Sequence, residues 1–184
     1  MLRARRAGLG RVAQRGLCRL PQLETVGPGC SSEEISDVSR ATVFQSMMNF
    51  IDMPGRFLPV TSVFVRPAEG EAGEDGALWR SMTFASGSRE GENIQEHIYA
   101  NPAAGVIRFV ELEPNGKEGE LEVVHALLTR PLRIEYFQRR GATEERVDWS
   151  APRADAVHAI ETTIALARAK HIQLCDPNFV GVKA

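Results

Sequence analysis

The sequence predicts an α+β fold in which six to seven antiparallel strands lie between helices and a long C-terminal helix covers the sheet. Two patterns indicate this. Apolar residues recur at helical spacing near both ends of the chain body and at every second position between them. Runs of strands bounded by helices are typical of α+β folds, in contrast to the alternation that parallel sheets require. The 184 residues are 43% hydrophobic and 25% charged, values that exclude collagen-like and wholly disordered chains.

The first helix is predicted over residues 40–51, where apolar side chains from Val43 to Phe50 fall on one face. Asp37 or Ser39 can cap it, because a short polar side chain accepts a hydrogen bond from a free amide of the first turn. Pro54 then ends the helix, since proline cannot continue the helical hydrogen bonding. A second short turn or helix follows before the strands begin.

The middle of the chain alternates apolar and polar residues, the pattern of strands with one buried face. Gly- and Pro-containing segments separate these runs and predict turns, and the Gly- and Glu-rich stretch 67–76 predicts a surface loop. The strands are expected over 60–65, 78–84, 94–99, 106–112, 121–129 and 132–138, with a short seventh at 146–149.

Apolar residues again recur at helical spacing after Ser150, a candidate N-cap, and predict a helix that extends to about His171. Ile160 and Ile164 belong to its apolar face. This helix is the element large enough to cover the buried face of the sheet. The remaining residues, 173–184, are expected to form an irregular tail.

Residues 1–23 differ from the rest of the chain, with six arginines and no acidic residue. Such a segment is typical of an organelle transit peptide, and it favours a mitochondrial address, with a plastid as the alternative. A basic tail that binds an acidic surface is a third interpretation. Residues 24–37 then form a linker or a short first strand, and residues 38–172 the folded domain.

The charge of the chain divides at the same point. The net charge of −2 combines the basic start with 16 bases and 24 acids in residues 24–184, a net charge of −8 there. Nucleic-acid binding is disfavoured because an acidic body repels phosphates. An integral membrane segment is not expected either, because no apolar run approaches the length of about 20 residues needed to span a bilayer.

The order of elements resembles the helix-grip fold of the START-like (SRPBCC) superfamily, over about residues 38–172. The nearest group is the set of small fungal, algal and bacterial AtaL-like proteins, largely of unknown function. The resemblance implies that the sheet is curved, wraps the terminal helix and encloses an apolar cavity, and it supplies no catalytic residue to map. The local matches are segments 40–44, 54–59, 92–99 and 105–109, and the helix start at 149–152.

The alternation along each strand predicts which residues face the cavity, because every second residue points to the same side of a sheet. The inward-facing positions, which are mostly apolar, include four polar residues. Two of them, Arg80 and Glu96, can pair with each other. A register shifted by one residue would instead put that pair on the exposed face. The candidate ligand-binding residues are Arg80, Met82, Glu96, His125, Tyr136 and Ile160.

The sequence contains no phosphate-binding, dinucleotide-binding, zinc-protease or serine-hydrolase motif. Its four histidines and three cysteines show no metal-ligand spacing, so we expect no cofactor and no metal, and we name no catalytic residue. The predicted function is the binding or carriage of a small hydrophobic molecule, such as a lipid, an isoprenoid or a polyketide-like compound.

Two alternatives stay open. One is a cyclase or aldol-type enzyme in which Glu96 or His125 moves a proton and Arg80 stabilises an oxyanion. The other is an accessory subunit of an organelle complex, which would need a protein partner.

Overall fold

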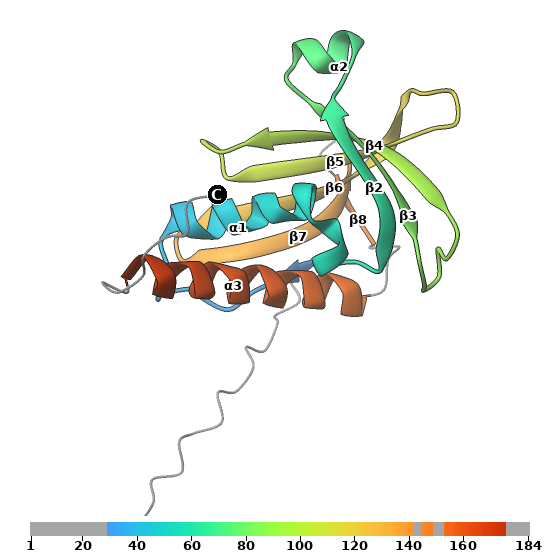
Figure 1. Ribbon diagram of the computed structural model, residues 1–184. Coiled ribbons are helices and arrows are strands. Elements are labelled where there is room, and N and C mark those ends of the chain that lie inside the picture. Colours follow the sequence, from blue (N-terminus) through green and yellow to red (C-terminus); the bar gives the residue numbers. More distant parts are fainter. Residues whose placement is uncertain (1–28, 142–144, 149–152, 176–184) are drawn as a thin grey trace, which may run out of the picture.

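A computed structural model describes residues 29–141, 145–148 and 153–175 and gives an α+β fold (Figure 1). The helices are α1 (Arg40–Asp52), α2 (Gly70–Glu74) and α3 (Arg153–Cys175), with a 3-10 helix η1 (Pro54–Arg56). One antiparallel sheet of eight strands curves around α1 and the long C-terminal helix α3, and the curved sheet with its long C-terminal helix confirms the predicted fold class. The strands are β1 (Cys30–Ser31), β2 (Val60–Pro67), β3 (Leu78–Phe84), β4 (Asn93–Asn101), β5 (Val106–Leu112), β6 (Glu118–Thr129), β7 (Leu132–Arg140) and β8 (Glu145–Val147).

The sheet is a meander from β2 to β7, in which each strand pairs antiparallel with the next. The short strand β1 pairs with β7 and forms the far edge, and β8 pairs with the end of β7. Strands that are neighbours in sequence are therefore neighbours in space, as the short connections of an antiparallel meander allow. The expected curved sheet is confirmed, and the two shortest strands bring the total to eight.

Helix α1 begins where the sequence predicts. The side chain of Ser39 accepts a hydrogen bond of 3.2 Å from the backbone amide of Thr42, so Ser39 is the N-cap. This bond satisfies one of the amides that have no partner within the helix. The helix ends at Asp52, immediately before the turn that carries Pro54.

Helices α1 and α3 lie side by side across the face of the sheet that β6 and β7 form (Figure 1). Their apolar faces meet in one continuous core, where Val43, Met47 and Ile160 are fully buried. Ile134 of β7 is buried in the same core. The helices thus fill part of the sheet's concave face, and the remaining part is left for the cavity described below.

The structure corrects two expectations about where helices occur. The segment 67–76, expected to be a loop, contains helix α2, and the predicted irregular tail begins too early because α3 continues to Cys175. Strand β1 lies within residues 24–37, where a short first strand was one of the two expectations. The transit-peptide segment 1–23 and the predicted cap Ser150 lie outside the described residues. No described helix is both long and apolar enough to cross a membrane.

Candidate functional site

A cavity of about 940 Å³ lies between the inner face of the sheet and the ends of helices α1 and α3. Strands β3 to β7 supply most of its wall, Phe50 closes it from the end of α1, and two alanines face it from the start of α3. Its apolar lining includes Phe50, Met82, Ile94, Phe109, Leu121 and Val123.

The cavity exists because the first turns of α3 present small side chains to the sheet. All four residues Ala156, Ala159, Ile160 and Ile164 belong to the apolar core that α3 shares with α1, but only the two alanines also line the cavity. Neighbouring positions on a helix point about 100° apart, so residues 159 and 160 face different sides. A large side chain at either alanine would occupy the space that is open here.

The inner wall carries a buried ion pair between two strands. Arg80 of β3 and Glu96 of β4 are register partners, and Nε of Arg80 donates a hydrogen bond of 2.6 Å to Oε1 of Glu96. Nη2 of the same guanidinium also contacts this oxygen, and the side chains are 1% and 7% exposed. Because a buried charge is costly unless it is paired, each residue depends on the other.

The same arginine reaches helix α1. Its Nη1 donates hydrogen bonds to the carbonyl oxygens of Phe50 and Ile51, in the last turn of that helix. Carbonyls at a helix C-terminus have no amide partner within the helix and carry partial negative charge, which a cation satisfies. Arg80 therefore joins the sheet to α1, and most of its donors are committed to protein groups.

Glu96 keeps one oxygen free on the wall of the cavity. Both contacts with Arg80 use Oε1, and Oε2 makes no hydrogen bond with the described residues. Burial raises the pKa of Glu96, and the neighbouring guanidinium of Arg80 opposes that rise. Glu96 thus offers an unsatisfied acceptor to any donor that enters.

His125 of β6 is enclosed by aromatic rings. Its ring stacks on that of Tyr136, with centroids 3.5 Å apart, and meets Phe50 edge-on at 4.6 Å. The side chain lines the cavity, the residue is 2% exposed, and Nδ1 has no hydrogen-bond partner among the described residues. Burial, aided by the positive charge of Arg80, lowers the pKa of His125 well below 6.5, so the imidazole is neutral at pH 7.

Tyr136 of β7 is committed to the protein at its polar end. Its hydroxyl lies 3.0 Å from Oγ1 of Thr163, and Thr163 donates a hydrogen bond of 2.8 Å to the carbonyl of Ala159. Since a threonine hydroxyl has one proton, Tyr136 is the donor to Thr163. Burial raises the pKa of Tyr136, which keeps the phenol protonated. The tyrosine thus ties β7 to α3 and presents its ring, rather than its hydroxyl, to the cavity.

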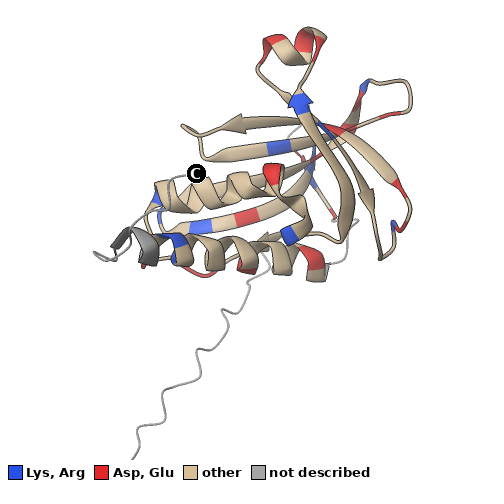
Figure 2. Ribbon diagram, viewed as in Figure 1, with Lys and Arg blue, Asp and Glu red and all other residues tan. Residues whose placement is uncertain are grey.

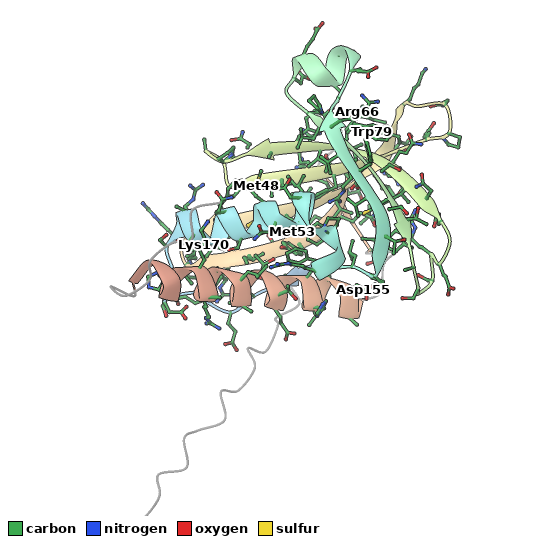
Figure 3. All side chains as sticks on the ribbon, in the orientation of Figure 1. Met48, Met53, Arg66, Trp79, Asp155 and Lys170 are labelled. Atoms are coloured by element: carbon green, nitrogen blue, oxygen red, sulfur yellow. The ribbon has the colours of Figure 1, made fainter. Side chains whose placement is uncertain are left out.

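The entrance to the cavity is acidic. In the turn between β3 and β4, Arg89 donates a hydrogen bond of 2.6 Å to Glu92 and one of 2.8 Å to Glu111 of β5, so its charge is already paired. Figure 2 shows acidic positions at the start of α3 and on the hairpin that joins β3 and β4. Figure 3 places Asp155 at this end of α3. The other exposed carboxylates of the lining are Glu113 and Glu120, and Glu120 pairs with Arg140.

Strand parity correctly placed most of the predicted residues on one face. Five of the six candidates line the cavity: Arg80, Met82, Glu96, His125 and Tyr136. Ile160 does not line it, because this residue packs in the core with α1. The role of the five lining residues in ligand binding stays a prediction.

Sequence reasoning missed the acidic entrance and the small residues of α3. The entrance residues lie in turns and at strand ends, where no periodic signal marks orientation. Ala156 belonged to the predicted apolar face of the helix and Ala159 did not, and helical spacing alone does not separate core positions from cavity positions. The described residues include no group of three or more His, Cys, Asp or Glu side chains that could hold a metal ion.

No family model and no curated protein matches the sequence. The structure is similar to that of the Zhui aromatase/cyclase from Streptomyces sp. R1128, with a TM-score of 0.50 and 12% identity, over 79% of this chain and 93% of that one. It also matches protein CV1439 from Chromobacterium violaceum, with a TM-score of 0.40 and 11% identity, over 78% of this chain and 96% of that one. At such identities the first likeness shows the fold alone, which is a helix-grip fold.

The state of His125 makes stability depend on pH. In the unfolded chain the imidazole binds a proton below about pH 6.5, whereas in the fold it resists protonation, so stability is lost as pH falls below 6.5. Each unit of pH in this range costs at most about 1.4 kcal/mol for one proton. Urea unfolding of the wild type and of His125→Phe at pH 7, 6 and 5 should show the smaller loss in the variant.

The phenylalanine variant keeps an aromatic ring between Phe50 and Tyr136 and contains every other titratable group, so those groups cancel in the comparison. Equal pH slopes for the two proteins would contradict a neutral, buried His125.

Proposed function

We propose that this protein binds or carries a small hydrophobic molecule in the cavity between the sheet and α3. The observation that carries the proposal is the cavity itself, about 940 Å³ in volume and lined largely by apolar side chains with a few polar groups. Sites for small organic ligands are usually of this kind, about 300–1,000 Å³ and mostly apolar.

The polar groups inside the cavity support a ligand with at least one hydrogen-bonding group. Oε2 of Glu96 and Nδ1 of His125 have no partner among the described residues, although both side chains are buried. Buried polar atoms are nearly always hydrogen-bonded, so atoms without a protein partner fit contacts with a ligand or water. An apolar molecule that carries a hydroxyl or keto group would suit this arrangement.

An enzyme of the cyclase or aldol type is the second candidate. It is favoured by the presence of Glu96 and His125, two groups capable of proton transfer, on the wall of one cavity. The proposed oxyanion role of Arg80 has less support, because the donors of this arginine serve Glu96 and the carbonyls of α1. Conversion of a bound linear diketone to a product one water lighter would favour this candidate over simple binding.

The finer family placement rests on sequence. Segments 40–44 and 92–99 resemble the AtaL-like group, and we propose membership of it on that basis. The accessory-subunit alternative has no contact or surface in the described structure that favours it over ligand binding.

Ligand binding can be tested with N-phenyl-naphthylamine, an uncharged probe that fluoresces in apolar surroundings. We expect a saturable fluorescence rise with one probe per chain. Ala159→Leu should weaken binding roughly tenfold, equivalent to about 1.4 kcal/mol, because the larger side chain enters the cavity. Fluorescence titration measures both the number of probe molecules per chain and the affinity of each protein for the probe.

Ala165→Leu is the matched control, because it makes the same substitution at an exposed position of the same helix. Its affinity should equal that of the wild type. The absence of saturable binding to the wild type, or equal affinity of Ala159→Leu, would contradict binding in this cavity.

We further propose that residues 1–23 direct the chain to mitochondria, on the strength of their six arginines and absence of acids. A fluorescent protein fused after residues 1–37 should co-localise with a mitochondrial marker. The same fusion with the six arginines changed to glutamine should stay diffuse. Plastid localisation would support the alternative address, and diffuse signal from the unchanged segment would contradict import.

A further inference from the structure

We propose that the cavity selects uncharged ligands and rejects carboxylates, sulfonates and phosphates of the same size and shape. This inference rests on the proposed ligand-binding function and specifies the chemical class of the ligand. It depends on how the charges of the lining are distributed and on which of them are already paired.

The described residues that line the cavity carry far more negative than positive charge. Two cations face five carboxylates: Arg80 and Arg89 against Glu96, Glu111, Glu113, Glu120 and Asp155. Glu96, Glu111 and Glu120 are paired with Arg80, Arg89 and Arg140, so the net negative charge of the lining comes from Glu113 and Asp155. An anion that enters meets repulsion from these two carboxylates. An uncharged ligand meets no such barrier.

Neither cation is free to receive an anion. Arg80, 1% exposed, bonds to Glu96 and to two carbonyls of α1. Arg89 shares its guanidinium between Glu92 and Glu111, with donors directed at both carboxylates. Binding an anion at either position would require breaking an existing ion pair, which leaves a carboxylate without its counter-charge.

The titratable group that remains in the interior beside the ion pair and Tyr136 is His125, which is uncharged. His125 lines the cavity while 2% exposed, and its Nδ1 has no partner among the described residues. Burial and the nearby Arg80 hold the pKa of this histidine below its usual range, so protonation does not supply the missing cation at neutral pH. A neutral imidazole has one donor and one acceptor nitrogen, which suits a hydroxyl or keto group.

The barrier to anions comes from two carboxylates at the entrance that no described cation neutralises. Among the described residues, the carboxylate of Glu113, in the turn after β5, accepts a hydrogen bond only from the side-chain amide of Asn115, and Asp155 in the first turn of α3 has no cationic partner. These two side chains lie on different elements that border the same cavity. Their removal should admit anions without changing the apolar interior.

The test compares two probes that share a ring skeleton, neutral N-phenyl-naphthylamine and its sulfonated analogue anilinonaphthalene sulfonate. The full chain should bind the neutral probe at least tenfold more tightly. A variant with Glu113→Gln and Asp155→Asn should bind the sulfonate severalfold more tightly than the wild type, with its affinity for the neutral probe unchanged. Raising the salt concentration should reduce this difference, because salt screens the entrance charges.

The control variant, Glu71→Gln with Glu74→Gln, removes the same number of charges from exposed positions of α2 that do not line the cavity. It should leave both affinities unchanged. Equal wild-type affinity for the two probes would overturn the charge selection and leave the cavity function intact. An equal gain by the control variant would also overturn it, since the total charge of the chain would then explain the effect. Failure of both probes to bind would contradict the proposed function itself.

Discussion

The ion pair between Arg80 and Glu96 is the interaction on which the rest of the structure depends. It lies at the junction of three elements, because the guanidinium bonds to a register partner on β4 and to the last carbonyls of α1. A charge pair in this position is costly to desolvate, and packed apolar residues of similar volume often stabilise a core at least as well. The ion pair between Arg80 and Glu96 instead serves to position the chain, because it holds the end of α1 against the inner face of the sheet.

This geometry has consequences for the cavity. Phe50, whose carbonyl accepts a hydrogen bond from Arg80, places its ring against His125 and closes one wall. The positive charge of Arg80 also helps to keep the imidazole neutral. One arginine therefore orders the helix end and adjusts the protonation of its neighbour. The interior offers hydrogen-bonding groups and no available cation, which is the basis of the inferred preference for uncharged ligands.

Sequence patterns predicted the order of elements and the inward face of most strands, because alternation is a strong signal when one face is buried. Arg80, Glu96 and His125 could be placed together by parity alone. The patterns could not separate Ala156, which lines the cavity, from Ile160, which does not, because both belong to the predicted apolar face of one helix. Nor could they find Glu113 and Arg89, since turns carry no periodic signal and their meeting at the entrance depends on tertiary structure.

The most direct test of this account is a double-mutant cycle on the buried pair, with the free energy of unfolding measured for Arg80→Met, Glu96→Leu and the double variant. Each single change should cost about 3–5 kcal/mol, because it leaves a buried charge or its acceptors unpaired. The double variant should be much more stable than the sum of the two losses predicts. Losses that add to within about 0.5 kcal/mol would show that the two residues act independently and would contradict the account.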